Sequence, residues 1–562
     1  MSGDSTIGRA LRALADLAEI RGAAAEANDL RRAAGAVAAL STSATTALMQ
    51  RARRDRLHDE PEITPLIHRR LRELALAGPD LAVSSARAVL PGLLRSLLDL
   101  GVVETEEAAL LVRQLGILTL GELFHALENG RVQETLGDNL DERLRHAAPA
   151  IARDVGLVPL GRARDILDSL TAAITTSSPA IDTISISGDA RRFESLVSEL
   201  ILLARALDPA SAIEQLCQAR GIEEILHRGP RRVVVTAHRT EVDVRVTVPD
   251  DYGTVLFSTT GSRPHVRVMR ARVGHLRLAP SEEDLYLHAG LPFIPPEIRD
   301  GSGELEAAAA GKLPSLISRE QIRGDLHMHT IYSDGADTVE GMVSACCALG
   351  YEYIAITDHS ERAAAGRTLS RRDLSRQRAE IEAVRERYPQ IIILHGVETD
   401  ILPDGSLDFP DRILETFDIV LASLHDSARQ DGKMLTRRTL QAIRHPLVNI
   451  LAHPANQLVG RREGYALDFE AVFAAAAETG TALEVDGAPA HLDLEGARAR
   501  EAIEAGATLS IDSDCHRARW LERQMELGIG TARRGWVEPR HVLNTRRVDE
   551  VRAFIAAKRR RR

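Results

Sequence analysis

Seven short apolar segments between residues 322 and 511 alternate with stretches whose apolar residues recur at helical spacing. Apolar runs of this length predict buried strands, and the stretches between them predict amphipathic helices. Strand and helix in alternation favour parallel strands joined by right-handed crossovers. Seven such units predict a barrel related in plan to the eight-stranded (β/α) barrel. The predicted strands are 322–329, 353–357, 391–394, 419–424, 448–452, 482–485 and 508–511.

Histidine and carboxylate residues stand at or just after the ends of most of these segments. Side chains two residues apart on a strand point to the same face, so His327 and His329 can reach one ion while Met328 points away. Asp514 and His516 repeat this spacing. Any one of these histidines alone is typical of a structural residue, but together they predict a metal centre. The nine candidate ligands are His327, His329, Asp334, His359, Glu398, His425, His453, Asp514 and His516.

The chemistry of these donors indicates the kind of metal. Imidazole and carboxylate ligands suit Zn, Mn or Fe better than Ca or Mg. A single catalytic zinc ion takes three or four protein ligands. The nine donors therefore predict two or three divalent ions, with Glu398 as the bridging carboxylate.

Residues 320–562 resemble the PHP (polymerase and histidinol phosphatase) domain. The resemblance implies a distorted seven-stranded barrel with three metal sites, in which neighbouring ions share a bridging hydroxide at Glu398 and no side chain acts as nucleophile. It also implies three ligand sets: His327, His329, Glu398 and Asp514; Glu398, His425 and His453; Asp334, His359 and His516. The motifs that carry it are 325–330, 333–335, 357–360, 396–398, 423–425, 452–454 and 514–516.

The first 300 residues differ in kind from the barrel region. Amphipathic helical patterns predominate up to about residue 151, for instance over 90–123 and 132–151. A mixed segment follows, with strands predicted at 183–187, 233–236 and 241–248. Because the chain has 562 residues, several separate cores are expected.

This half resembles the catalytic core of the bacterial family X DNA polymerases, known as PolX. The similar segments are 116–123, 158–163, 260–265 and 290–299. The resemblance implies a multidomain α/β chain with a helical N-terminal domain of the 8-kDa type over 1–85 and a helix-hairpin-helix, fingers-like region over 86–155. It further implies a mixed α+β palm and thumb over 156–310, followed by the PHP barrel over 320–562.

The predicted polymerase site lacks its acidic pair. Nucleotidyl transfer needs an Asp-x-Asp pair and a third aspartate to hold two Mg²⁺ ions. Glu199 and Ile201 stand in place of the pair, and only Asp243 keeps the third carboxylate. Asp189 also replaces a serine expected to bind phosphate. We therefore predict that polymerase activity is lost; the alternative, a displaced alignment with Glu194 or Glu199 supplying acids, stays open.

Composition restricts the partners. The net charge of −10 provides no overall attraction to nucleic acid, so DNA contacts must be local. Weak contacts are expected from Arg191, Arg192, Arg263 and His491, the last of which stands where the PolX pattern has arginine. The four cysteines lack zinc-finger spacing, and no apolar run reaches membrane-spanning length. A reduced, cytoplasmic setting without a membrane partner is expected.

The leading functional hypothesis is a metal-dependent phosphoesterase that acts on DNA, as a 3′–5′ exonuclease or in 3′-end processing during repair. Two other enzymes stay open: an active polymerase X that fills gaps, and a phosphatase for a small phosphorylated metabolite of the histidinol phosphate kind. A non-enzymatic hypothesis makes the first half a module that binds DNA or a protein partner.

Overall fold

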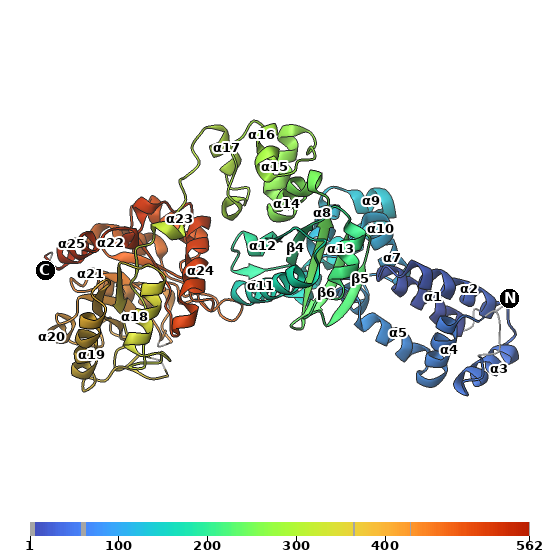
Figure 1. The fold of residues 1–562 in the computed structure, drawn as a ribbon, viewed down its shortest axis with the longest axis horizontal. Helices are drawn as coiled ribbons and strands as arrows, with labels where there is room; N and C mark the ends of the chain where they lie inside the picture. Colours follow the sequence, from blue (N-terminus) through green and yellow to red (C-terminus); the bar gives the residue numbers. More distant parts are fainter. Residues whose placement is uncertain (1–5, 58–62, 364–365, 428, 561–562) are drawn as a thin grey trace.

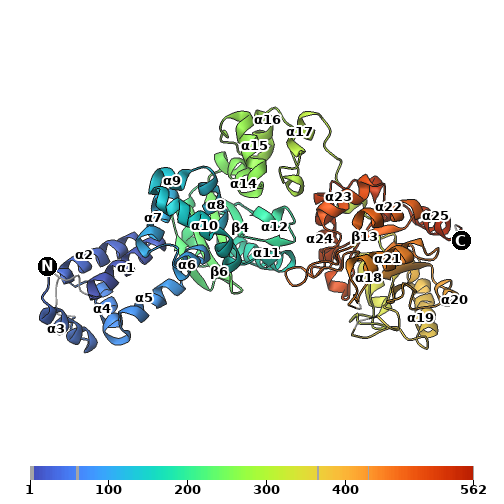
Figure 2. The same cartoon turned by 180° about the vertical axis from the view of Figure 1, so that it is seen from behind.

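The computed structural model describes residues 6–57, 63–363, 366–427 and 429–560 of the chain. The molecule is elongated, and its two termini lie at opposite ends (Figures 1 and 2). A helical region at the N-terminal end adjoins a five-stranded sheet in the middle, and a seven-stranded barrel forms the C-terminal end.

Over residues 6–57 and 63–155, the described part of the N-terminal region, the chain forms ten helices. One cluster of buried side chains joins residues from Ala10 to Ile151 and also includes Leu226 and Val234 of the central sheet, so residues before and after position 85 share a core. Gly116 takes a left-handed conformation that ends α7, and Thr119 caps α8 by accepting from the Glu122 amide. The helices are α1 (Thr6–Ile20), α2 (Ala24–Ala38), α3 (Thr42–Arg53), α4 (Pro65–Ala77), α5 (Pro79–Ala88), α6 (Gly92–Asp99), α7 (Thr105–Leu115), α8 (Leu120–Glu128), α9 (Arg131–Leu136) and α10 (Asp138–Val155).

The middle of the chain folds as a mixed sheet in the order β2-β4-β7-β6-β5, in which only β4 and β7 are parallel. Its core packs on α11 and α13. We call this part the palm. Its elements are β1 (Val158–Pro159), α11 (Leu160–Ser177), β2 (Thr183–Ser187), α12 (Gly188–Arg191), β3 (Leu196–Val197), β4 (Leu200–Arg205), α13 (Pro209–Leu216), β5 (Glu224–Arg228), β6 (Arg232–Ala237) and β7 (Thr240–Thr247).

Four helices follow the palm and lie on one side of the palm and the barrel, at the top of Figure 1. Their own cluster of buried side chains includes Phe257, Tyr286 and Ile294. We call this part the thumb. Its helices are α14 (Tyr252–Thr260), α15 (Arg263–Val273), α16 (Glu282–His288) and α17 (Glu304–Ala309).

Seven parallel strands form the barrel in the order β8 to β14 along the sheet. A parallel bridge between Met328 and Cys515, with the His329 amide donating to the Cys515 carbonyl, joins the two edges and nearly closes the barrel. The strands are β8 (Gly324–Asp325), β9 (Tyr353–Ile356), β10 (Ile392–Asp400), β11 (Ile419–Ser423), β12 (Ile450–Leu451), β13 (Ala482–Asp486) and β14 (Leu509–Asp512).

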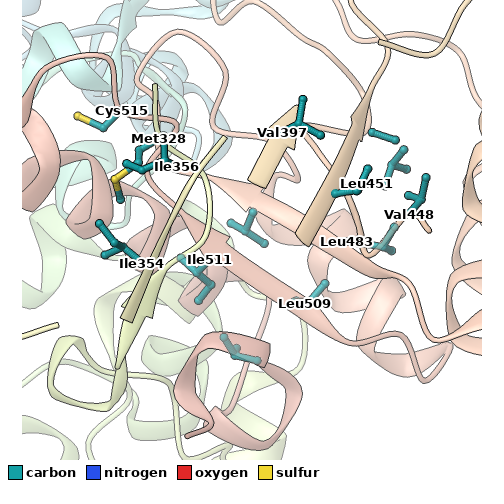
Figure 3. Packing of buried hydrophobic residues seen from close by; sticks show 14 of the residues in the cluster. Met328, Ile354, Ile356, Val397, Val448, Leu451, Leu483, Leu509, Ile511 and Cys515 are labelled. Atoms are coloured by element: carbon teal, nitrogen blue, oxygen red, sulfur yellow. The ribbon is translucent and has the colours of Figure 1, made fainter. Parts of the chain in front are cut away.

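Alternate residues of each strand serve two different cores. One set packs outward against the surrounding helices, and Figure 3 shows members of it on β9, β10, β12, β13 and β14. The other set, such as Leu394 and Leu421, points inward and is covered by α25. The helices are α18 (Val339–Ala348), α19 (Leu374–Arg387), α20 (Asp411–Leu414), α21 (Gly432–Arg444), α22 (Phe469–Thr479), α23 (Gly496–Glu504), α24 (Leu521–Arg534) and α25 (Val548–Arg559).

The predicted barrel is confirmed strand by strand, with two strands shorter than expected. The first strand is regular only over Gly324–Asp325, and the fifth only over Ile450–Leu451. In both, the chain leaves the strand just before the residues that carry ligand side chains. The predicted helical stretch 90–123 divides into α6, α7 and α8. The palm strands β4 and β5 and helix α11 were not predicted. The predicted domain boundaries stay predictions.

Palm and barrel pack against each other directly. Val459, Leu492 and Leu527 of the barrel region join the palm core. Gly530 on α24 lies so close to Phe193 that an added Cβ would stand 2.0 Å from the ring. In the described ranges, no single helix is long and apolar enough to cross a membrane; α7 and α8 pass such a test only together, bent by 76°.

Candidate metal centre

Glu398 lies at the centre of the barrel's carboxyl end, fully buried on the inner face of β10. Four histidines from four other segments surround its carboxylate. His359 Nδ1 lies 2.6 Å from Glu398 Oε2, and His327 Nε2 lies 3.5 Å from the same oxygen. His453 Nε2 lies 2.9 Å and His425 Nε2 lies 3.3 Å from Oε1. One carboxylate therefore faces imidazoles on both of its oxygens.

The two histidines of the first motif converge as the strand spacing predicts. Their Nε2 atoms lie 3.1 Å apart. Asp514 Oδ1 lies 3.0 Å from His329 Nε2 and 3.5 Å from His327 Nε2. The His329 ring stacks with the ring of His359 and with that of His516, and each pair of ring centroids is 4.3 Å apart.

Asp334 completes the open side of the cluster. Its Oδ1 lies 3.2 Å from His516 Nε2 and 3.5 Å from His359 Nε2. The side chains of Asp334 and His516 are 26% and 31% exposed, whereas Glu398 is not exposed at all. A substrate would therefore approach from the side of Asp334 and His516.

The structure brings all nine predicted ligands into one cluster. Ligand atoms within 4.8 Å of one another form three groups among them: His329, Asp334, His359 and His516; His327, His329 and Asp514; His359, Glu398 and His425. His453 joins through its contact with Glu398.

The donor set fits divalent metal ions. Imidazole and carboxylate donors together are the set that transition metals prefer. Glu398 Oε2, Asp334 Oδ1 and His359 Nδ1 are buried, and among the described residues their close contacts with imidazole or carboxylate neighbours do not have hydrogen-bond geometry. Buried polar atoms without partners are costly, and bound ions would satisfy these.

The electrostatics of the cluster point the same way. Burial alone would raise the pKa of Glu398, but His359, His425 and His327 outweigh it and hold that pKa well below its usual range. Burial and the neighbours His359 and His516 lower the pKa of His329 to about 3. An ionised Glu398 is the state that metal binding requires. The neighbouring carboxylates raise the pKa of His425 to about 10 and that of His516 to about 9, so these imidazoles would release protons when ions bind.

Two carboxylates that sequence reasoning missed orient the ligands. Glu484 Oε1 accepts from His327 Nδ1 at 2.7 Å, which leaves His327 Nε2 facing the cluster. Asp400 Oδ1 accepts from His425 Nδ1 at 2.8 Å and does the same for that ring. Such contacts fix the tautomer and aim of a metal-binding histidine. Asp400 follows Glu398 by two residues on one strand face, which was the available signal.

Asp358 organises the loop that carries the first motif. Its carboxylate accepts from the Thr330 amide at 2.7 Å, the Thr330 hydroxyl at 2.6 Å and the Ser333 hydroxyl at 2.5 Å. Its side chain therefore holds the loop between His329 and Asp334. Its position directly before His359 was visible in the sequence, but its partners were not.

His491, predicted as a DNA contact, lies at the edge of the centre. Its ring stacks on His453 with centroids 5.4 Å apart, and its Nδ1 donates to the Gln457 carbonyl at 2.9 Å. A further group of possible ligands consists of Asp486, His491 and Asp514. Burial, followed by the charge of His453, lowers the pKa of His491 to about 4, so this side chain is neutral at pH 7.

The predicted polymerase site contains a closed ion network instead of a pair of free carboxylates. Asp243 on β7 accepts from Arg232 Nε at 2.7 Å and from Arg245 Nε at 2.8 Å. Both arginines also contact Glu122 on α8. Ile201 is the strand partner of Asp243, so an apolar side chain stands beside the aspartate. The groups of possible metal ligands among the described residues all lie in the barrel.

The other residues near the palm site are also paired within the chain. Glu199 accepts from the Gly121 amide of α8. Arg191 pairs with Glu282, and Arg263 pairs with Glu128. The buried Arg192 pairs with Asp189 and Glu194. The predicted DNA contacts of these three arginines stay predictions, and each would have to exchange an existing partner for phosphate. A cavity of about 600 Å³ remains between α8, the palm and the thumb.

Comparison with known proteins gives three likenesses. The PHP domain family matches residues 325–484. A DNA polymerase/3′–5′ exonuclease PolX of Bacillus subtilis is 34% identical over 507 residues, which cover 86% of this chain and 88% of that protein. A probable phosphatase of Caldanaerobacter subterraneus is 31% identical over 203 residues, which cover 34% of this chain and 75% of the phosphatase.

Among solved structures, the chain resembles a histidinol phosphate phosphatase from Lactococcus lactis, which was solved in complex with zinc, L-histidinol and phosphate. The alignment covers 38% of this chain and 94% of the phosphatase chain. The identity is 15% and the TM-score is 0.31. A likeness at that score supports no conclusion about function.

Proposed function

The chain belongs to the PolX family of DNA polymerases and 3′–5′ exonucleases, and we propose that its PHP barrel is a metal-dependent phosphoesterase that removes nucleotides from DNA 3′ ends. We further propose that its polymerase-like half no longer polymerises. The single observation that carries the proposal is the convergence of nine imidazole and carboxylate ligands on the buried Glu398.

Two or three Mn or Zn ions are proposed for this centre. His327, His329, Glu398 and Asp514 would hold one ion, Glu398, His425 and His453 a second, and Asp334, His359 and His516 a third. When bound, such ions supply a nucleophile from water at neutral pH and stabilise the negative charge of the phosphate. This arrangement needs no side-chain nucleophile.

The protein's own residues position these ligands and limit access. Glu484 and Asp400 keep the Nε2 atoms of His327 and His425 directed at Glu398. Full burial of Glu398 excludes bulk water from one side of the centre. Exposure of Asp334 and His516 leaves the other side open, which supports entry of a chain end from solvent.

Loss of polymerase activity is supported by the palm's ion network. Two Mg²⁺ ions would require free carboxylates at facing positions of the neighbouring strands β4 and β7. Asp243 is instead occupied by Arg232 and Arg245, and its strand partner Ile201 offers no oxygen. Glu194, the other acidic candidate, pairs with Arg534 of the barrel region at 2.9 Å.

The proposal is tested on a 3′-recessed primer–template with a 5′ label, incubated with the full chain and Mn²⁺, with and without deoxynucleotides. Shortening of the primer in both lanes is expected. Glu398→Gln removes a central charge worth several kcal/mol to the reaction, so the rate should fall by about 10³-fold or more. Glu142→Gln, which makes the same change at an exposed position of α10, serves as the matched control and should act as the wild type does.

Any other outcome of the primer assay contradicts one part of the proposal. Lengthening of the primer with deoxynucleotides would contradict the loss of polymerase activity. An unchanged primer, together with hydrolysis of p-nitrophenyl phosphate, would replace DNA by a small phosphoester as the substrate. Metal content and far-UV circular dichroism of the Glu398→Gln variant show whether lost activity reflects lost ions or lost fold.

A further inference from the structure

One set of possible metal ligands extends beyond the nine predicted positions. Asp486 ends β13, His491 lies in the loop that follows, and Asp514 stands two residues after the end of β14. One ligand atom from each of these three residues lies within 4.8 Å of the others. The match to the PHP domain family ends at residue 484, before all three.

Asp486 has an unused oxygen in this set. Its side chain is fully buried, and its Oδ1 accepts from the Ala488 amide at 2.6 Å. Its Oδ2 is buried and has no hydrogen-bond partner among the described residues. A buried, unpartnered carboxylate oxygen is costly unless a cation or a proton satisfies it.

His491 is oriented as metal-binding histidines are. Its Nδ1 donates to the Gln457 carbonyl, which fixes the tautomer and leaves the lone pair on Nε2. In the described part of the chain, no hydrogen bond or ion pair joins His491 to Asp486 or Asp514. Two ligands of a tetrahedral ion, with bonds of about 2.0–2.2 Å, lie about 3.4 Å apart. The three ligand atoms lie within 4.8 Å of one another, so small side-chain movements would bring them onto one ion.

We propose that Asp486, His491 and Asp514 form an additional divalent-cation site, which shares Asp514 with the main centre. A carboxylate offers two oxygens, so Asp514 can bridge the two sites. One imidazole with two carboxylates favours Zn, Mn or Fe over Ca or Mg. This inference rests on the proposed metal-dependent function of the barrel.

The additional site also accounts for the departure at position 491. The PolX pattern that this chain resembles has arginine there, which carries a permanent charge and binds phosphate in a fixed geometry. Histidine carries no such permanent charge. A cation held by His491 restores positive charge at the same edge of the centre, where it can contact the phosphate of the departing nucleotide.

The test counts metal ions per chain in the full-length protein after loading with Mn²⁺ or Zn²⁺ and removal of free metal. Asp486→Asn and His491→Gln are each expected to hold one ion fewer than the wild type. Asp80→Asn and His146→Gln make the same chemical changes at exposed positions and should hold as many ions as the wild type. An equal count in all five proteins would refute the additional site.

Two further measurements separate this inference from the proposed function. Anomalous scattering from metal-loaded crystals should place one peak between Asp486, His491 and Asp514; peaks confined to the other ligands would refute the site. His491→Arg should lose one ion yet still shorten the primer, because the guanidinium supplies the charge. A wild type that holds ions and shortens DNA, with unchanged counts in the variants, contradicts the additional site alone. A wild type without ions or hydrolysis contradicts the proposed function itself.

Discussion

Asp243 is predicted to stabilise the palm, and its replacement by alanine tests this role. Its side chain is 2% exposed and lies between Arg232 and Arg245, whose side chains are 15% and 22% exposed. Burial alone would raise the pKa of Asp243, but Arg245 and Arg232 lower it below its usual value. The aspartate is therefore ionised and acts as the counter-charge of two partly buried guanidinium groups.

The expected loss follows from the charges that remain. Removing one member of a buried ion network costs about 3–5 kcal/mol, because an uncompensated charge stays in the interior. In the variant, Arg232 and Arg245 still share Glu122 as a partner. The free energy of unfolding of Asp243→Ala should therefore fall by the lower end of this range, about 3 kcal/mol. A loss of that size accelerates amide exchange through local opening by about 150-fold.

Hydrogen exchange followed by mass spectrometry measures this effect segment by segment. The increase is expected in β6, β7 and α8, which carry the network. Tryptophan fluorescence is unsuitable, since Trp520 and Trp536 both lie in the barrel region. Asp182→Ala is the matched control: its pair with Arg205 is half exposed and worth below about 1 kcal/mol. If amide-exchange rates in β7 and α8 of Asp243→Ala stay within about fivefold of the wild-type rates, the reasoning is refuted.

Three further predictions concern pH, packing and metal. Burial raises the pKa of Glu199 to about 7 in the folded protein, compared with 4.5 in the unfolded chain. The stability that the protonated side chain contributes is therefore complete below pH 4.5 and is lost as the pH rises through 7. Glu199→Gln should therefore stabilise the palm by about 3 kcal/mol at pH 8 and by less than half of that at pH 5.5, as hydrogen exchange of α8 would report; equal effects at both pH values would contradict this. Gly530→Ala forces a methyl group against Phe193 and should destabilise the palm–barrel contact by about 1–3 kcal/mol, seen as faster proteolysis between the two parts, whereas Gly35→Ala has open space and should not. Chelation followed by dialysis should abolish primer shortening and lower the melting temperature of the barrel, and Mn²⁺ should restore both; activity that survives complete metal removal would contradict the metal centre.

The barrel and the grouping of its ligands were predictable because both depend on local periodicity. Apolar runs of strand length define which residues are buried, and the residue that ends each run lies at the carboxyl end of the barrel. His327 and His329 are spaced so that they must share a face. The proposed loss of the polymerase site was also visible, since Ile201 has no oxygen to offer a metal ion.

The amino-acid sequence by itself determined the alternation of strand and helix. It also singled out the nine proposed ligand positions and the proposed loss of the acidic pair, because these depend on residue type and short-range spacing. Tertiary structure alone decided which charges meet. Arg232, Arg245 and Glu122 are separated along the chain by up to 123 residues, yet they close around Asp243. Likewise, Asp486 and His491 follow β13 whereas Asp514 follows β14, and the pairing of these two strands brings the three residues together. Contacts between distant segments depend on how packed elements dock, and spacing along one segment carries no signal for them.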